Sequence, residues 1–299
     1  MCIRDRYLGD IAVDRKLNKN FDDLLAKILL SIGQVLSFRT LRKKLGLQRA
    51  EFAASGAAPI APEVLKFFMS IGVPLFEAYG MTENCAYATS NSPENIKIGT
   101  VGIPAHGVEL KLADDGEILI RSGGVFKGYF KDEQATNETI DKDGWLYTGD
   151  VGIYEGDFVK IVDRKRDIII TSGGKNVSPS EIENKIKVSP FIKEALVIGD
   201  RRKFLSVLIG IEFDTVSNWA LRKNIPHTTY RDLSEKKEVR DLVWKEISKA
   251  NKKTSSLEVR EFRMIPKELD HEEGELTATQ KVKRNVLLDQ FSDLIEEMY

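Results

Sequence analysis

Four clusters of residues have types and spacings that could serve a nucleotide. The first is Tyr79-Gly80-Met81-Thr82-Glu83, which follows a short predicted strand at 73–77. It offers an aromatic face, a glycine that allows close backbone approach, a hydroxyl and a carboxylate, which suit a nucleotide and its metal ion. Upstream, the small residues Ser55-Gly56-Ala57-Ala58-Pro59 leave room for a flat ring or an acyl chain against the backbone. Taken singly, either segment is also typical of an ordinary turn.

The second cluster is Trp145-Leu146-Tyr147-Thr148-Gly149-Asp150. An aspartate just past a glycine turn is well placed to accept two hydrogen bonds from the hydroxyls of a ribose. The competing interpretation is a solvated aspartate in a turn, a common role for this residue type.

The third cluster runs from Asp163 to Thr171-Ser172-Gly173-Gly174-Lys175-Asn176. It is not a phosphate-binding P-loop, because Ile169 stands where the first glycine is required and Asn176 replaces the Ser/Thr. A flexible glycine pair that lets a thin ligand pass fits better. The fourth cluster is 276–284, around Lys281; a lone lysine of this kind is usually a solvent-exposed side chain.

The elements that must position these clusters fall into two parts. Residues 20–95 read as alternating helices and buried strands, with a helix at 62–69 and a strand at 73–77. Residues 96–163 are rich in β structure, with hairpin turns at Asp115-Gly116 and Glu155-Gly156. Beyond the charged run 163–167, which we interpret as a linker, Ser178 predicts a helix start, and strands follow at 195–198 and 205–211. The fold class is therefore α/β, with domains at 1–163 and 164–299.

Composition excludes several classes of function. Lys and Arg number 45 and Asp and Glu 46, so the net charge of −1 provides no electrostatic reason for a nucleic-acid partner. Two cysteines and three isolated histidines form neither a disulfide framework nor a zinc motif, which points to a reducing compartment. The run 24–38 is too interrupted to span a membrane; we expect a packed amphipathic helix, the alternative being a membrane-surface helix. We expect a cytoplasmic protein, with membrane contact at most peripheral; the oligomeric state stays open.

In order and spacing, the four clusters resemble the motif series of adenylate-forming enzymes. The Tyr-Gly-Met-Thr-Glu, Tyr-Thr-Gly-Asp and Asp-Arg-Lys-Arg-Asp to Gly-Gly-Lys segments are specific as a set, and the resemblance is strongest to AMP-forming long-chain fatty acid–CoA ligases. It implies a two-step reaction with ATP, Mg²⁺ and CoA. A fatty acid carboxylate attacks the α-phosphate of ATP to form an acyl-adenylate, and the CoA thiolate then displaces AMP.

The resemblance also implies roles for individual residues. Tyr79 resembles the residue that stacks on adenine, Thr82 the hydroxyl that contacts phosphate, and Glu83 the magnesium ligand. Asp150 and Arg164 resemble the ribose contacts.

Lys281 resembles the lysine of the small domain that reaches the α-phosphate during adenylation. The hinge and CoA-facing group would comprise Asp163, Lys165, Arg166, Gly173, Gly174 and Lys175. Two positions depart from the family pattern: Asp163 replaces a glycine, as in long-chain ligases, and Gln280 replaces the glycine before the terminal lysine.

The resemblance covers the C-terminal half of such an enzyme. Nothing in residues 1–78 resembles the family's phosphate-binding loop, so we expect a fragment, made of the end of the large α/β and β-barrel domain and a small mobile domain. One alternative is a noncatalytic nucleotide- or CoA-binding module, against which Glu83, Asp150 and Lys281 argue. Another is an adenylation domain that serves another carboxylate or a carrier protein; no carrier domain follows Lys281, which favours CoA.

Overall fold

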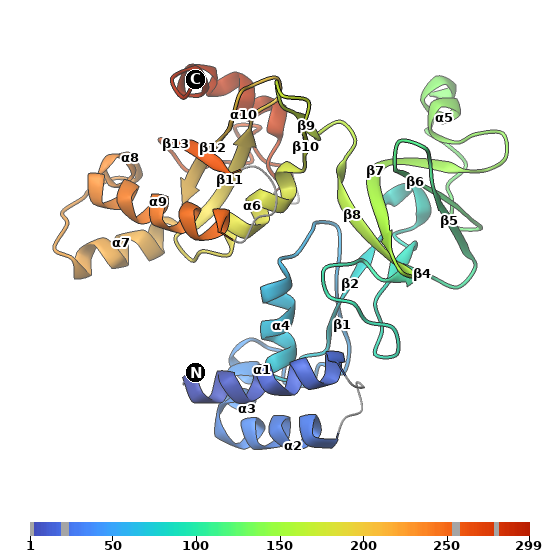
Figure 1. The fold of residues 1–299 in the computed structure, drawn as a ribbon, viewed down its shortest axis with the longest axis horizontal. Coiled ribbons are helices and arrows are strands. Elements are labelled where there is room, and N and C mark those ends of the chain that lie inside the picture. Colours follow the sequence, from blue (N-terminus) through green and yellow to red (C-terminus); the bar gives the residue numbers. More distant parts are fainter. Residues whose placement is uncertain (1–2, 19–23, 253–257, 278–280) are drawn as a thin grey trace. The chain divides into compact units, whose positions relative to one another are not determined.

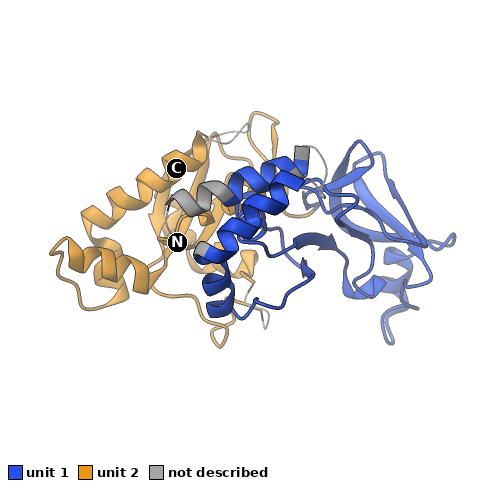
Figure 2. Ribbon diagram, turned by 90° about the horizontal axis from the view of Figure 1, so that it is seen from below, with its two compact units in different colours: residues 1–165 blue, residues 166–299 orange. Residues whose placement is uncertain are grey.

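The computed structural model describes residues 3–18, 24–252, 258–277 and 281–299. The chain divides into two compact units, Met1–Lys165 and Arg166–Tyr299, which Figure 2 shows in two colours. The mixed α/β class predicted from the sequence is confirmed. Among the described residues, none of the helices has the length and apolar character needed to cross a membrane.

The first unit begins with a group of helices. Helix α1 packs against both α2 and α4, and α2 continues through a π-helical turn into α3. The expected amphipathic helix over 24–38 is present, but its apolar stripe is not packed as we expected: Leu25, Ile28 and Ile32 are 51, 46 and 46% exposed. The reason is that α2 buries a narrow side formed by Ala26 and Gly33. The helix bounds are α1 Ile3–Asn18, α2 Leu24–Gly33, the π-helix Gln34–Phe38, α3 Arg39–Lys44 and α4 Pro62–Ser70.

A four-stranded sheet follows in the order β1-β2-β3-β4. Figure 1 labels its strands β1, β2 and β4. Strands β1 and β2 are parallel, with α4 as the crossover between them, while the other pairs are antiparallel. Helix α4 begins as predicted, because Pro62 at its first turn has a fixed φ suited to a helix and lacks an N–H that would stay unpaired there. The strand bounds are β1 Ala53–Ser55, β2 Leu75–Tyr79, β3 Thr89–Ser90 and β4 Ile103–Pro104.

The β-rich part of the first unit is an antiparallel sheet in the order β5-β6-β7-β8. Both predicted hairpin turns are confirmed, with Gly116 at φ +82° and Gly156 at φ +71°, the left-handed region in which glycine has no Cβ penalty. Ile118, Ile120 and Val159 form its buried face. A helix that the sequence did not predict, α5, precedes β7. The bounds are β5 Val108–Leu112, β6 Glu117–Ser122, α5 Glu133–Thr139, β7 Leu146–Glu155 and β8 Phe158–Arg164.

The second unit is a three-stranded sheet, β11-β12-β13, covered on both faces. In β12, Val207 and Ile209 join a core with α6, α7 and α9, whereas Leu208 on the opposite face joins α10 and α11. The Ser178 hydroxyl accepts the Glu181 N–H at 3.2 Å and caps α6 as predicted. The bounds are β9 Ile169–Ile170, β10 Asn176–Val177, α6 Pro179–Lys187, β11 Ile192–Ile198, β12 Leu205–Ile211, α7 Phe213–Arg222, α8 Tyr230–Glu235, α9 Lys237–Asn251, β13 Val259–Met264, α10 Arg284–Gln290 and α11 Ser292–Glu296.

Candidate functional site

Two glycine-containing loops leave the same edge of the first sheet. Because β1 and β2 are parallel, the loop after Ser55 and the loop after Tyr79 both start at the carboxyl ends of their strands. Gly56 lies against β2 so closely that a Cβ there would stand 3.0 Å from the carbonyl oxygen of Ala78. In open α/β sheets, ligands bind at this edge of the strands. The structure thus brings the segment 56–59 and the segment 79–83, predicted separately, to one edge.

The loop after β2 has a tight and specific geometry. A Cβ at Gly80 would come within 2.3 Å of the carbonyl carbon of Ala86, so only glycine fits there. The Met81 N–H donates to Oδ1 of Asn84 at 2.9 Å, and Thr82–Asn84 form a 3₁₀ turn. The turn leaves the Thr82 side chain exposed and Glu83 partly exposed. Both side chains are therefore available to a ligand.

The Glu83 carboxylate is held by a tyrosine. Its Oε1 accepts a hydrogen bond from the Tyr129 hydroxyl at 2.9 Å. Among the described residues, no group of three or more His, Cys, Asp or Glu side chains could hold a metal ion by itself. A single carboxylate fits Mg²⁺ bound jointly with a nucleotide, because this ion usually keeps its waters and adds one or two carboxylates and substrate phosphates.

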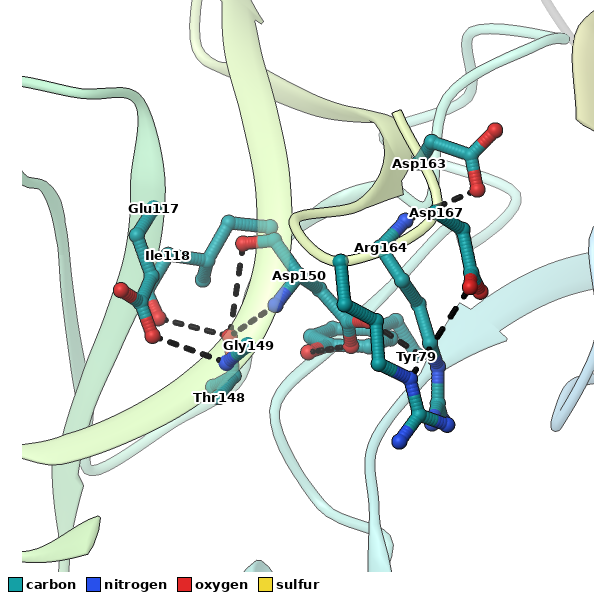
Figure 3. A network of polar contacts seen from close by, with 10 residues as sticks. Tyr79, Glu117, Ile118, Thr148, Gly149, Asp150, Asp163, Arg164 and Asp167 are labelled. Carbon is teal, nitrogen blue, oxygen red and sulfur yellow. Dashed lines mark hydrogen bonds and ion pairs between the residues drawn. The ribbon is translucent and has the colours of Figure 1, made fainter. Parts of the chain in front are cut away.

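Asp150 and Arg164 face each other across strands β7 and β8. They are paired residues in the register of the two strands, and Nε of Arg164 lies 3.5 Å from Oδ1 of Asp150. The Tyr79 hydroxyl donates to the other oxygen, Oδ2, at 2.6 Å (Figure 3). Tyr79 and Asp150 are 71 positions apart in the sequence. Three residues predicted as nucleotide contacts, Tyr79, Asp150 and Arg164, therefore meet at the carboxylate of Asp150.

The sequence interpretation of Asp150 as a residue of a glycine turn is wrong in its local structure. Gly149 and Asp150 lie inside the ten-residue strand β7, and Asp150 is only 8% exposed. The register between β6 and β7 shifts here, since Glu117 pairs with Val151 whereas Leu119 pairs with Tyr147. Gly149, at φ +71°, lies in the resulting bulge. A bulge re-aims side chains within a sheet, which is how a strand residue can resemble a turn residue in sequence.

Burial controls the protonation of this pair. It raises the pKa of the Asp150 carboxyl, while the hydrogen bond from Tyr79 and the charge of Arg164 act in the opposite direction. The pKa of the Tyr79 hydroxyl is raised strongly, first by burial and then by the charge of Asp150. Tyr79 is therefore a hydrogen-bond donor throughout the accessible pH range. Its ring is 9% exposed and packs with Ala88 and Val101, so little of it is open to a stacking partner.

The charged run interpreted as a linker is partly strand. Asp163 and Arg164 are the last residues of β8, and the Asp163 side chain is 5% exposed, with Oδ1 accepting the N–H of Arg164 at 2.8 Å. Strand pairing with β7 continues to this point, which is why the linker interpretation is wrong for these two residues. Lys165 and Arg166 follow in a turn.

The remaining predicted site residues lie in the second unit. Gly173, Gly174 and Lys175 form the tip of a hairpin between β9 and β10, where the Thr171 N–H donates to the Lys175 carbonyl at 3.1 Å. Lys281 is hydrogen-bonded twice to Thr277: its N–H donates to Oγ1 of Thr277 at 3.0 Å, and its carbonyl accepts from the Thr277 N–H at 2.8 Å. Residues 278–280, including the noted Gln280, lie outside the described part of the chain.

Sequence reasoning gave no role to three residues that shape the site. Tyr129 holds Glu83, Thr148 donates to the Ile118 carbonyl at 2.7 Å, and the buried Glu117 accepts the Gly149 N–H at 2.9 Å. Glu117 carries a weak signal, because it is a carboxylate in the first position of a strand whose next residues are buried and apolar. Tyr129 carries none, since its partner is 46 positions away.

Comparisons with known proteins identify the family of the chain. The AMP-binding enzyme family matches residues 21–130, and the AMP-binding enzyme C-terminal domain matches residues 166–299. The long-chain-fatty-acid–CoA ligase FadD15 of Mycobacterium bovis is 37% identical over 279 residues, covering 92% of this chain and 46% of that protein. The long-chain-fatty-acid–CoA ligase ACSBG2 of Gallus gallus is 32% identical, covering 90% of this chain and 38% of that protein. The chain thus spans less than half the length of these curated relatives.

Solved structures show the same fold. The A domain of carboxylic acid reductase from Segniliparus rugosus, in complex with AMP and a co-purified carboxylic acid, superposes with a TM-score of 0.68 at 22% identity. This likeness covers 99% of the present chain and 46% of the reductase domain. The two family matches account for both units, the first up to residue 130, and the chain belongs to the AMP-binding enzyme family.

Proposed function

We propose that this chain supplies the nucleotide- and CoA-facing half of an AMP-forming long-chain fatty acid–CoA ligase. In the first step, a carboxylate oxygen bonds to the α-phosphorus of ATP, and the bond to pyrophosphate breaks. In the second step, the CoA thiolate bonds to the acyl carbon, and the bond to AMP breaks. The observation that carries the proposal is the meeting of Tyr79, Asp150 and Arg164 at the edge to which the two loops lead.

The proposed nucleotide contacts follow from which hydrogen-bonding atoms of each side chain already have a protein partner. Asp150 Oδ2 is occupied by the Tyr79 hydroxyl, so Oδ1, beside Arg164, is the oxygen that accepts from a ribose hydroxyl. Arg164, whose side chain is 56% exposed, donates to the same ribose. The main chain of 56–59 borders the adenine, where small residues permit close approach, and Tyr79, which is 9% exposed, offers it little more than an edge.

The phosphates belong at the 3₁₀ turn. The exposed hydroxyl of Thr82 is free to meet a phosphate oxygen, and Glu83 supplies one carboxylate oxygen to Mg²⁺ shared with the phosphates. Bound there, the ion supplies charge neutralisation as negative charge develops on the phosphate oxygens. Tyr129 orients the Glu83 carboxylate through its 2.9 Å hydrogen bond.

The two units take different parts in this scheme. We assign the first unit to the end of the large adenylate-forming domain, its β5–β8 sheet standing for the barrel portion, and the second unit to the small domain. In the second unit, Lys281 would stabilise charge on the α-phosphate during adenylation, and the glycine hairpin at 173–174 would face CoA during thioester formation. Lys165 and Arg166 would lie at the hinge. We propose the cytoplasm as the compartment and at most peripheral contact with membranes.

The choice of a long-chain fatty acid rests on the named relatives. The ligases that are 37% and 32% identical to the chain are both named for long-chain fatty acids. The match runs through the loops at 56–59 and 79–83 as well as the second unit, since it covers 92% of the chain.

Calorimetric titration of the 299-residue chain tests the nucleotide part of the proposal. AMP should bind and GMP should bind at least tenfold more weakly, and Asp150→Asn should weaken AMP at least tenfold, since a hydrogen bond to a charged group is worth about 1.5–3 kcal/mol. ATP–Mg²⁺ should show little advantage over AMP, because residues 1–78 contain no motif like the family's phosphate-binding loop. Failure to bind AMP, or equal binding of GMP, would contradict the proposal.

A further inference from the structure

A closed ring of three interactions surrounds the bulge in strand β7. The Gly149 N–H donates to Oε1 of Glu117 at 2.9 Å, and Nζ of Lys165 donates to Oε2 of the same carboxylate at 2.9 Å. The Lys165 N–H closes the ring by donating to the Gly149 carbonyl at 2.8 Å. Its members come from β6, from β7 and from the residue directly after β8. Glu117 thus links three consecutive strands of one sheet.

The ring is adjacent in sequence to both members of the candidate ribose site. Gly149 precedes Asp150, and Lys165 follows Arg164, while Asp150 and Arg164 are themselves paired across the strands. Holding residues 149 and 165 therefore fixes the backbone from which both functional side chains extend (Figure 3 shows Glu117, Gly149, Asp150 and Arg164). Ladder pairing holds Asp150 opposite Arg164 between β7 and β8, but between β6 and β7 the register is broken at the bulge, so there the ring takes the place of ladder pairing.

The charges of the ring are complementary. Glu117 is 6% exposed, and its charge is compensated by Lys165, which also contacts Oδ2 of Asp115 at 2.5 Å. The two carboxylates raise the pKa of Lys165 above its usual value, chiefly through the hydrogen bonds to Asp115 and then to Glu117. A lysine held in its charged form can keep a buried carboxylate paired, where an unpaired one would be costly.

We infer that Glu117, together with Lys165, is a positioning residue for recognition of the ribose hydroxyls. The inference rests on the proposed function, and it adds residues that the motif comparison did not assign to this role. Glu117 does not touch the nucleotide; it fixes the bulge so that Oδ1 of Asp150 and the guanidinium of Arg164 stand ready together. Loss of Glu117 therefore releases the bulge and costs the hydroxyl-dependent part of nucleotide binding, not the part contributed by the base and phosphate.

The test compares AMP with 2′,3′-dideoxy-AMP, which lacks both ribose hydroxyls, by calorimetric titration of the full chain. The wild-type chain should prefer AMP by roughly 10–100-fold, the value expected for one hydrogen bond to a charged group. Glu117→Ala should reduce this preference at least tenfold, so that a wild-type preference near tenfold disappears. The affinity for dideoxy-AMP should stay within about twofold of the wild-type value. Lys165→Met should reduce the preference by several-fold, and Lys165→Arg should retain it because the guanidinium can still reach both carboxylates.

A matched control is Glu109→Gln, which removes the exposed partner of Arg121 from the same sheet and should leave the preference unchanged. If Glu117→Ala does not fold, as judged by urea unfolding, Glu117→Gln replaces it; its amide can still accept from Gly149 but cannot pair with the charge of Lys165, so a several-fold loss is expected. If both Glu117 variants keep the wild-type preference for AMP, or lose affinity equally for AMP and dideoxy-AMP, the positioning role of Glu117 is wrong but the proposed function stands. A wild-type chain that binds AMP and dideoxy-AMP equally overturns the ribose role of Asp150 as well.

Discussion

The Tyr79 hydroxyl, at the end of β2, donates a 2.6 Å hydrogen bond to Oδ2 of Asp150, in the middle of β7. The two residues belong to different sheets of the first unit and are 9% and 8% exposed. The bond joins the parallel β1–β2 edge to the antiparallel β7–β8 pair, and it leaves one carboxylate oxygen beside Arg164 for a ligand. The Asp150 side chain thus combines a structural tether with the ribose-binding role that we propose for it.

Removing this hydroxyl should destabilise the first unit. Tyr79→Phe keeps the ring in its core but leaves a buried carboxylate oxygen without its donor, which should lower the free energy of unfolding by about 1.5–3 kcal/mol. Trp145 is the sole tryptophan of residues 1–165, so its fluorescence during urea unfolding reports on this unit once Trp219 and Trp244 are replaced by Phe.

Tyr129→Phe is the matched control, because Tyr129 also donates to a carboxylate but is 39% exposed. Its cost should stay below about 1 kcal/mol, since water can replace a lost partner at an exposed site. Equal effects of the two substitutions would show that the Tyr79–Asp150 bond has no special weight.

Glu77 should make the stability of the chain depend on pH. Burial raises its pKa from 4.5 to about 7, opposed by a hydrogen bond that the carboxylate accepts from the Ile60 backbone. Because the folded chain holds this proton more tightly than the unfolded chain, the stabilisation is fully present below pH 4.5 and is lost as pH rises through about 7. At pH 8 the neutral variant Glu77→Gln should exceed the wild type by up to about 3 kcal/mol.

The measurement is the free energy of urea unfolding of both proteins between pH 4 and pH 8. The raised pKa of Asp150 acts in the same direction in both proteins, so it cancels in the difference between them. Parallel pH profiles for wild type and Glu77→Gln would rule out this role for Glu77.

The glycine pair of the β9–β10 hairpin offers two substitutions with opposite expectations. Gly174 has φ +75°, where an alanine costs about 1–2 kcal/mol, so Gly174→Ala should lower the stability of the second unit by that amount. Gly173 has no such φ and open space around an added Cβ, so Gly173→Ala should leave stability within about 0.5 kcal/mol.

CoA titration should separate a role of the hairpin in CoA binding from its role in stability. If the hairpin faces CoA as proposed, Gly173→Ala should weaken CoA several-fold in calorimetric titration although the fold is unaffected. Unchanged CoA affinity in Gly173→Ala would remove the hairpin from the CoA path.

Lys281 should serve only one of the two half-reactions. In an active ligase that contains these residues, Lys281→Ala should slow acyl-adenylate formation about 10²–10³-fold, because a cation at the developing negative charge is lost. Attack of CoA on a supplied acyl-adenylate should change less than about threefold. Pyrophosphate release and acyl-CoA formation measure the two steps separately. Lys245→Ala, which removes an exposed lysine of α9, is the control; equal losses in both steps would contradict the assignment.

Local signals in the sequence were sufficient for several elements. Pro62 and Ser178 start helices because a fixed φ and a side-chain acceptor satisfy the needs of a first helical turn within four residues of the chain. Gly116 and Gly156 mark hairpins because glycine has no Cβ to clash at positive φ. The motif residues 79–83, 150 and 164 were likewise recognisable as candidates, since their types and order are properties of the chain alone.

The surroundings of these residues depend on contacts between distant parts of the chain. The sequence suggested a solvated turn or a glycine turn for Asp150, whereas in the structure it is a buried strand residue beside a bulge. The bulge is held by the hydrogen bond from Gly149 to Glu117, which lies 32 positions earlier in the chain. The partnership of Tyr79 with Asp150 spans 71 positions, and that of Glu83 with Tyr129 spans 46. Such pairs have no local signature, because the free energy that selects them comes from burying the two sheets of the unit against each other, and it exists only after the strands have assembled.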